Sequence, residues 1–505
     1  MIKKSLNTAL RAYLAHRYSR ILGIRKDAVA LNDQQFKTLI QYGKDTTYGR
    51  MNDFSSITTF SEYQKSCPLK DYNAVKNIFY EVMDGHDNLI WPGSIDYFSK
   101  SSGTTEEKSK YLPVSKDLIS QNLRASGWDA TSCIYNHQAG ANILGKKNLL
   151  MGGSLKKLSN GKQIGDVSAI MVDNLPQFSK QFYAPDFKIA LMDNWEEKIE
   201  LMAQQLIHED MYLIGGVPTW VVVLFRRLLE LSGAADICEL WPGLKLYAHG
   251  GVGFEPYIEQ FNEFLPCPDL DYMEVYNASE GYFGVQDDLN NDDLLLLTGN
   301  GIFYEFIADR NIDLPNPETI SLKDVSIDCN YEMVISSVAG LWRYRLGDMI
   351  RFTSKNPYRF KIAGRTKQYI NTFGEEVMIS DTDKAISLAC LKVNAQVNEY
   401  TVAPVFMDAT RKGGHEWIIE FEKEPLDIDL FQKILDDCLQ EVNSDYQAKR
   451  YKDMALENLK IHKAPQGIFE EWLRKKGKLG GQNKVPRLSP KRTFIEEIKE
   501  LIRTS

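Results

Sequence analysis

Residues 101–113 have the sequence Ser-Ser-Gly-Thr-Thr-Glu-Glu-Lys-Ser-Lys-Tyr-Leu-Pro, and this stretch indicates more about the fold than any other. The segment before it, residues 95–99, alternates apolar and polar side chains and predicts a short strand. A strand that enters a Ser/Thr/Gly loop can bind phosphate, because backbone N–H groups and hydroxyls donate to phosphate oxygens and a lysine offsets their charge. Such loops are mostly ordinary turns, so further motifs must decide.

Length and composition limit the classes of protein to which the chain can belong. With 505 residues it is too long for one compact core, so two or more domains are expected. Its 43% hydrophobic and 25% charged residues are typical of a globular protein. The net charge of -8 gives no support to a nucleic-acid-binding role.

The cysteines and the apolar segments bear on the compartment. The cysteines never form a C-x-x-C pair, which predicts reduced thiols in a cytoplasmic protein and neither a disulfide framework nor a zinc site. The basic N-terminus, from Lys3 to Lys26, predicts a helix of the fold and not a transit peptide. The most apolar stretch, residues 212–231, contains glycines and arginines, so it predicts a buried helix that begins near Pro218 and no membrane span.

The order of expected elements predicts an α/β protein with mixed sheets and helices. Residues 1–90 are expected to be mainly helical, and strands and helices alternate from about residue 95 to 360. Expected strands lie at 111–114, 164–171, 244–248, 271–276, 301–307, 331–336, 349–352, 396–406 and 416–421. Expected helices lie at 195–207, 219–232, 253–264, 427–442 and 490–503. The pattern changes near residue 365, so we expect a large domain at 1–365 and a small one at 366–505.

A second motif, residues 276–284, follows an expected strand and has the sequence Tyr-Asn-Ala-Ser-Glu-Gly-Tyr-Phe-Gly. Most such segments are core strands with a capped turn. The functional interpretation places Tyr276 against a purine and makes Glu280 a ligand of Mg²⁺, which prefers one or two carboxylates together with phosphate oxygens.

Three more segments carry candidate charges. In the third motif, Tyr-Arg-Leu-Gly-Asp at 344–348, Gly347 allows a tight turn that points Asp348 outward, where a carboxylate can accept hydrogen bonds from ribose hydroxyls. Arg365 follows Gly364, and Lys484 lies in a glycine- and lysine-rich loop before the last helix. The ordinary interpretation of each is a solvated surface turn. A lysine on a small domain can also reach a phosphate or carboxylate in a cleft between domains.

Other enzyme motifs are not complete. The Gly-Lys pairs lack the rest of a Walker A loop, and Gly251-Val-Gly253 is not continued to G-x-G-x-x-G. No histidine belongs to H-E-x-x-H, and no G-x-S-x-G is present. Simple hydrolases and P-loop enzymes therefore fit poorly.

Together, in this order, the motifs resemble those of adenylate-forming enzymes, the luciferase-like (ANL) superfamily. They resemble more closely the GH3 (auxin-responsive promoter) family of acyl-acid amido synthetases. SSGTTEEKSKYLP resembles the first motif of that family, YNASEGYFG the second and YRLGD the third. The segments HGGVGFEPY (249–257), ISDTDKAI (379–386), EVNSDYQAKR (441–450) and NKVPR (483–487) also resemble it. Each motif alone is weak, but the ordered set is specific and spans most of the chain.

The resemblance implies a large N-terminal adenylate-forming domain with a smaller, mobile α+β C-terminal domain. It implies an acid–amino acid ligase that uses ATP and Mg²⁺. A carboxylate attacks the α-phosphate to give an acyl-adenylate and pyrophosphate, and an amine, typically of an amino acid, then displaces AMP. The alternatives are an acyl-CoA or other thiol ligase and a catalytically silent nucleotide-binding protein. The acid, the amine and the oligomeric state stay unidentified, and substrate does not follow from fold.

The resemblance also implies roles for single residues. The phosphates would contact Ser101, Ser102, Gly103, Thr104 and Thr105, with Lys108 or Lys110 nearby. The adenosine would contact Gly250, Gly251, Tyr276, Ser279, Arg345, Asp348 and Arg365. Glu280 would hold Mg²⁺, and Lys484 would bridge the α-phosphate and the carboxylate. Trp128, Tyr212 and Val217 are candidates for an acyl pocket, although such residues are more often core. One departure is Glu107, where the family commonly has glycine.

Overall fold

The computed structural model describes residues 2–504 except 103–108, 252–253, 255–257, 313, 328, 366–368, 371, 376, 408–411, 451–455 and 477–484. Its α-helices are α1 (Ile2–Gly43), α2 (Thr47–Met51), α3 (Phe60–Ser66), α4 (Tyr72–Met83), α5 (Arg124–His137), α6 (Val167–Asp173), α7 (Gln177–Lys180), α8 (Phe187–Ala190), α9 (Trp195–Leu206), α10 (Pro218–Ser232), α11 (Ile237–Leu240), α12 (Ile258–Phe264), α13 (Ile379–Val393), α14 (Ile428–Val442), α15 (Ser444–Arg450), α16 (Ile468–Lys475) and α17 (Thr493–Thr504). Its strands are β1 (Tyr97–Ser102), β2 (Ser109–Val114), β3 (Lys147–Leu150), β4 (Leu155–Lys157), β5 (Gln163–Gly165), β6 (Met211–Gly216), β7 (Leu246–His249), β8 (Asp271–Ala278), β9 (Gly281–Val285), β10 (Leu294–Leu296), β11 (Ile302–Ala308), β12 (Ile320–Ser321), β13 (Asn330–Ser337), β14 (Tyr344–Lys355), β15 (Tyr358–Arg365), β16 (Tyr369–Ile370), β17 (Val377–Met378), β18 (Gln396–Val405), β19 (Gly414–Lys423) and β20 (Lys460–Ala464).

An 11-stranded sheet forms the centre of the N-terminal part, in the order β12-β11-β13-β14-β15-β10-β9-β8-β7-β6-β3. At one end, β3, β6, β7 and β8 run parallel. From β8 to β12 the neighbours are antiparallel. Parallel neighbours need crossover connections, which α10 and α12 provide after β6 and β7. The sheet therefore combines a smaller parallel α/β part with a larger antiparallel part, as the expected mixed class requires.

A smaller sheet carries the first motif. Its order is β2-β1-β5-β4, and β1 and β2 pair antiparallel with Ser101 opposite Lys110. The Ser/Thr/Gly loop therefore connects the two strands of a hairpin, and its residues 103–108 lie outside the described part of the chain. Lys110 is held at the base of this loop by strand pairing.

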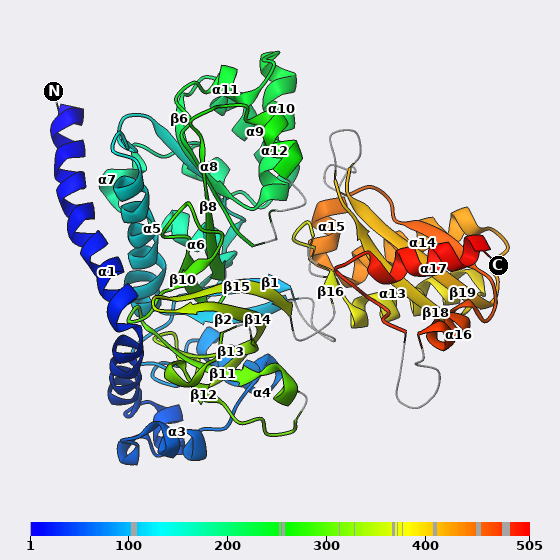
Figure 1. Cartoon of the computed structure of the whole chain (residues 1–505), viewed down its shortest axis with the longest axis horizontal. Helices are drawn as coiled ribbons and strands as arrows, with labels where there is room; N and C mark the ends of the chain where they lie inside the picture. Colours follow the sequence, from blue (N-terminus) through cyan, green and yellow to red (C-terminus); the bar gives the residue numbers. More distant parts are fainter. Residues whose placement is uncertain are drawn as a thin grey trace.

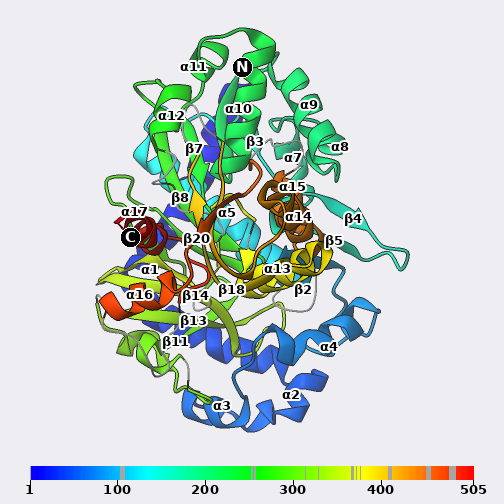
Figure 2. The same cartoon turned by 90° about the vertical axis from the view of Figure 1, so that its right-hand side faces the viewer.

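The C-terminal part is built on the three-stranded sheet β18-β19-β20. Side chains alternate between its two faces, because successive residues of a strand point to opposite sides. Trp417 and Ile419 of β19 pack in a core with α13 and α14, whereas Ile418 packs in another with α16 and α17. This is the expected smaller α+β unit, and it lies beside the larger part in Figure 1 and in front of its middle in Figure 2. The boundary at 365/366 stays a prediction.

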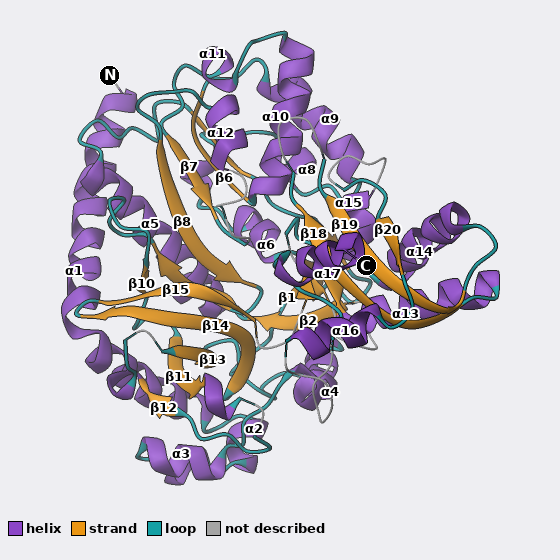
Figure 3. Cartoon of the chain, turned by 45° about the vertical axis from the view of Figure 1, so that its right-hand side comes forward, coloured by secondary structure: helices purple, strands orange, loops and turns teal. Residues whose placement is uncertain are grey.

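Helices cover the outer side of the N-terminal part. The long α1 runs beside α5 along one edge of the molecule (Figures 1 and 3). Arg17 of α1 bonds to the buried Asp129 of α5, and Arg25 pairs with the buried Asp287. The basic N-terminal segment is thus part of the fold, as expected.

Two element predictions are wrong in detail. The expected strand at 164–171 is largely the helix α6, because Asp166 has an extended backbone and starts a new element after the short β5. Short apolar runs fit a strand or a buried helix equally well, which explains the error. The expected helix at 253–264 begins only at Ile258 among the described residues.

The prediction that all cysteines are reduced is also wrong. Cys238 and Cys267 form a disulfide, with their Cα atoms 5.8 Å apart, and the other five cysteines are free. Cys238 and Cys267 lie 29 residues apart in the sequence, and only the tertiary fold brings them together.

Among the described helices, none has the length and apolar character that crossing a membrane requires.

Candidate active site

A cavity of about 1580 Å³ lies where the carboxyl ends of β6, β7 and β8 meet. Ligands of α/β sheets bind at this edge, because the loops that leave the strands open outward there. The wall includes Gly216, His249 and Tyr276 from these three strands, and residues of the C-terminal part also line it. Typical small-molecule pockets measure about 300–1,000 Å³, so this cavity has room for more than one ligand.

The predicted floor residues Gly250 and Gly251 line the cavity directly after β7. A Cβ on Gly250 would lie 2.2 Å from the carbonyl oxygen of Val275, so only glycine lets this turn pass so close to β8. Gly251 has a φ of +84°, a conformation that favours glycine. The glycine pair therefore keeps backbone, and no side chain, at this part of the wall.

The structure brings Tyr276 and Asp348 together in the cavity wall. The Tyr276 hydroxyl donates to Oδ2 of Asp348 at 2.5 Å, and the two residues are 5% and 6% exposed. Gly347 has a φ of +80° and lies in an irregularity where residues 346–348 of β14 oppose Met333 alone. Asp348 thus belongs to a bulged strand and not to the predicted tight turn, but the bulge still directs it into the cavity.

Ser279 and Glu280 form the turn between β8 and β9, and both line the cavity. Among the described residues, no three His, Cys, Asp or Glu side chains gather as a metal site. Mg²⁺ usually rests on one or two carboxylates and on phosphate oxygens, so the buried carboxylate of Glu280 fits this mode of binding.

Lys110 of the first motif also lines the cavity, and its Nζ lies 5.8 Å from the ring centroid of Tyr72. Lys100, on the same hairpin, lines it as well. Arg365 is the cross-strand neighbour of Asp348 in β15, which places the two motif residues side by side in the backbone. Gly103, Thr104, Thr105, Glu107 and Lys484 lie outside the described residues.

Arg345 differs from its predicted role. Its guanidinium pairs with Glu332 at 2.5 Å and donates to the carbonyl of Ile312. The described residues that line the cavity do not include it. Strand register explains the difference, because Arg345 lies opposite Val334 of β13 and on the same face of the sheet as Glu332, before the bulge at 346–348 changes the register.

The C-terminal part contributes a polar wall through α15. Ser444, Asp445 and Lys449 line the cavity, and Lys449 is buried. Its Nζ lies 4.3 Å from the ring centroid of Trp220 and 5.6 Å from that of Trp195, both in the N-terminal part. A cation over the face of an indole is attracted by the ring electrons, so this contact holds the two parts together.

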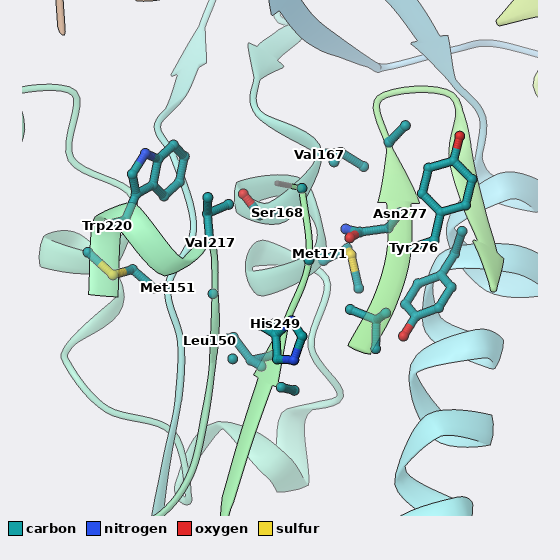
Figure 4. A pocket seen from close by; sticks show the side chains of 18 of the residues that line it. Leu150, Met151, Val167, Ser168, Met171, Val217, Trp220, His249, Tyr276 and Asn277 are labelled. Carbon is teal, nitrogen blue, oxygen red and sulfur yellow. The ribbon is translucent and has the colours of Figure 1, made fainter. Parts of the chain in front are cut away.

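The remaining wall is mostly apolar (Figure 4), and it also contains the buried basic residues Lys198 and His249. Lys198 of α9 is 1% exposed, and its Nζ donates to the carbonyls of Gly152 and Gly153 at 2.7 Å each. Burial lowers the pKa of Lys198 to about 8, although Asp166 and Asp193 oppose the shift. Burial also lowers the pKa of His249 to about 4.

Comparison with models of protein families shows to which family the chain belongs. The model of the GH3 family N-terminal domain matches residues 17–183 and 156–270. The models of the GH3 family central and C-terminal domains match residues 295–365 and 380–493. The chain belongs to the GH3 family. The cavity described above therefore lies in a GH3 protein, between segments assigned to all three domains of the family.

Several plant GH3 proteins are similar in sequence. A 4-substituted benzoates-glutamate ligase of Arabidopsis thaliana is 26% identical over 276 residues, 49% of this chain and 46% of that protein. A jasmonoyl-L-amino acid synthetase of Nicotiana attenuata is 21% identical, over 65% of this chain and 67% of that protein. An indole-3-acetic acid-amido synthetase of Arabidopsis thaliana is 25% identical, over 50% and 44%. The alignments with the first and third cover less than half of those proteins.

Solved structures support the fold over nearly the whole chain. An acyl acid amido synthetase of the GH3 family, in complex with 2,4-DB, has a TM-score of 0.62 at 17% identity and covers 97% of both chains. A 2-hydroxyisobutyryl-CoA ligase in complex with 2-HIB-AMP and CoA has a TM-score of 0.54 at 13% identity and covers 97% of this chain and 93% of that one. These similarities confirm the predicted adenylate-forming fold.

Sequence reasoning found the motif residues of the cavity but missed much of its wall. Trp128 and Val217 do line the cavity, whereas Tyr212 lies in a core cluster and donates to Gln138. His249 and Lys449 were inside segments that resembled the family, but nothing in the sequence indicated their burial. A lone lysine or histidine carries no periodic signal, so only packing reveals such residues.

Proposed function

We propose that this GH3 protein is an ATP-dependent acyl-acid amido synthetase, an acid–amino acid ligase that converts ATP to AMP and pyrophosphate. One observation carries the proposal. Residues of all three predicted motifs, Lys110, Glu280 and Asp348, line a single cavity together with α15 of the C-terminal part. A large shared cavity of this kind supports a reaction between a nucleotide and a second substrate.

In the first step, a carboxylate oxygen of the acid attacks the α-phosphorus of ATP, and the bond to pyrophosphate breaks. Transfer of this kind depends mainly on positioning and on offsetting charge, so it needs no nucleophilic side chain. Lys110 lies where it can offset phosphate charge, and Asp348, oriented by Tyr276, can accept hydrogen bonds from a ribose. Glu280 would hold Mg²⁺, which neutralises phosphate charge when bound. The role of Lys484 stays a prediction.

In the second step, the amine nitrogen attacks the acyl carbon, AMP leaves with the bonding electrons, and the amine loses a proton. The acyl-adenylate is a mixed anhydride that water hydrolyses, so exclusion of water favours amide formation. The contribution of α15 supports this role, because Ser444, Asp445 and Lys449 of the C-terminal part line the cavity. Amino acids are the amines we propose, since the relatives include a glutamate ligase and an L-amino acid synthetase.

Pyrophosphate exchange tests the first step directly. The full chain is incubated with ATP, Mg²⁺, labelled pyrophosphate and a panel of carboxylic acids, and one or more acids should produce labelled ATP. The Lys484→Ala variant should lose most of this exchange, and unimpaired exchange would exclude its proposed role. The best acid is then combined with a panel of amino acids and, separately, with coenzyme A.

Each outcome assigns a different function. Amide formation supports the proposal, whereas thioester formation without amide would make the protein a thiol ligase. Binding of ATP without exchange for any acid would indicate a silent nucleotide-binding protein. The cytoplasmic location is also part of the proposal, although the Cys238–Cys267 disulfide removes two of the thiols on which it rested.

A further inference from the structure

His249 is a buried polar residue that the motif assignments leave without a role. It ends β7, lines the cavity and is 6% exposed. Its ring stacks on Phe254 with centroids 4.2 Å apart and an angle of 22° between the planes. Nδ1 is buried and has no hydrogen-bond partner among the described residues. The fold thus fixes the orientation of this ring but leaves its Nδ1 without a hydrogen-bond partner among the described residues.

The cavity wall beside His249 is mostly apolar, and it also includes Glu274, the cross-strand partner of His249 in β8. Figure 4 shows the ring beside Leu150 and on the same side of the cavity as Met151 and Val217. A buried polar atom that lacks a hydrogen-bond partner destabilises a protein. A ligand that fills the cavity can supply the missing partner.

The imidazole is neutral at pH 7, because burial lowers its pKa to about 4. A neutral imidazole has one N–H donor and one lone-pair acceptor, and the tautomer decides which nitrogen has which role. It does not form an ion pair with a carboxylate at this pH. A ligand hydroxyl suits both tautomers, since a hydroxyl can both donate and accept.

The position of His249 favours the acid over the nucleotide as its partner. Tyr276, which pairs with Asp348, lies on the other side of Met171 in Figure 4. Leu150, beside the ring in that view, is aliphatic and outside the predicted adenosine set, whereas Gly250 and Gly251 of that set follow His249 in the chain. The apolar body of an acid therefore fits this region better than a ribose or a phosphate does.

We propose that His249 is a specificity-determining residue that hydrogen-bonds a hydroxyl on the otherwise apolar body of the acid substrate. The preferred class is therefore a hydroxylated monocarboxylic acid with an aromatic or aliphatic body. The inference rests on the proposed acid-activating function and adds the class of acid to it.

Pairs of acids that differ by one hydroxyl test the proposal. Benzoic acid is compared with its hydroxybenzoic isomers, cinnamic acid with its hydroxycinnamic isomers, and fatty acids with their hydroxylated derivatives. For at least one pair, we expect kcat/KM for pyrophosphate exchange to be about tenfold higher for the hydroxy acid, the value of one neutral hydrogen bond. His249→Phe keeps a ring for stacking on Phe254 and should remove this preference without a change in the KM for ATP.

Two further variants make the result specific. His249→Asn keeps a side chain that donates and accepts, so it should retain part of the hydroxyl preference. Met151→Leu changes the shape of the same wall without a polar group, and it should change size selectivity but leave the hydroxyl preference intact. Thermal stabilisation by each acid pair gives a second measurement that does not depend on turnover.

The outcomes separate this inference from the proposed function. Exchange without a hydroxyl preference, in activity and in thermal stabilisation, overturns the inference and leaves the function intact. A His249→Phe variant that raises the KM for ATP and keeps the preference also overturns it, because His249 would then contact the nucleotide. If no acid supports exchange or stabilises the protein, both the function and the inference fail.

Discussion

The Tyr276 hydroxyl donates a hydrogen bond of 2.5 Å to Oδ2 of Asp348, and this bond joins two sequence motifs that lie 72 residues apart. Tyr276 belongs to β8, in the parallel part of the large sheet, and Asp348 belongs to the antiparallel part. The ring of Tyr276 also packs against Phe283 and Phe360. The orientation of Asp348 toward the cavity therefore depends on packing between the parallel part and the antiparallel part of the sheet.

Removal of this hydroxyl should affect both stability and nucleotide binding. The Tyr276→Phe variant keeps the packing with Phe283 but leaves the buried Asp348 carboxylate without one donor. We expect the free energy of unfolding to fall by about 1–3 kcal/mol and the KM for ATP to rise about tenfold. Urea denaturation and ATP titration of pyrophosphate exchange measure the two effects. An unchanged KM for ATP would contradict the role of Asp348 in nucleotide binding.

Glu280 should control the requirement for magnesium. The Glu280→Gln variant keeps the shape of the turn between β8 and β9 but loses the charge that we assign to the metal. The Mg²⁺ concentration for half-maximal exchange should rise by about tenfold or more, since hard cations prefer carboxylate oxygen. The exposed Glu263 of α12 provides a matched control, and Glu263→Gln should leave the magnesium titration unchanged. Equal behaviour of the two variants would remove Glu280 from the metal site.

The Lys449–Trp220 contact should stabilise the observed arrangement of the N-terminal and C-terminal parts. Lys449→Met keeps the length of the side chain but removes the charge over the indole rings, at a cost of about 1–2 kcal/mol. We expect a change in tryptophan emission and faster proteolysis between the two parts. The exposed Lys433 of α14 gives the control variant Lys433→Met, for which neither signal should change. A silent Lys449→Met variant would show that the contact has no role in holding the parts together.

The lowered pKa of the buried Lys198 should give the protein an unusual dependence of stability on pH. Its pKa is lowered to about 8 in the fold against 10.5 as the ordinary value, so above pH 8 the unfolded state binds more protons than the native state. Stability therefore rises with pH in this window, by about 2 kcal/mol between pH 8 and pH 10. The neutral amine still has two N–H groups for the carbonyls of Gly152 and Gly153.

The Lys198→Met variant isolates this effect from other groups that titrate at high pH. As the pH rises, the free energy of unfolding of the natural chain should increase relative to that of the variant. Parallel urea denaturation series at several pH values measure it. A difference that does not depend on pH would mean that Lys198 has an ordinary pKa and is not desolvated.

The sequence by itself determined the order of most elements and the family. Strand and helix patterns at 271–276, 301–307 and 219–232 agree with β8, β11 and α10, because local periodicity follows from which face is buried. The motif residues Glu280 and Asp348 both line the cavity, and their predicted roles in binding Mg²⁺ and ribose stay predictions. Residues 164–171 were assigned wrongly, because a short apolar run has no period long enough to separate strand from helix.

Tertiary structure alone decided the partners of these residues. Strand register pairs Arg345 with Glu332 in an ion pair, and packing buries His249 and Lys198 in the mostly apolar wall of the cavity. The Cys238–Cys267 disulfide and the Lys449–Trp220 contact join segments that are distant in the chain. The physical reason is common to all of them. Burial and pairing depend on which elements meet in space, whereas a residue pattern reports only its own element.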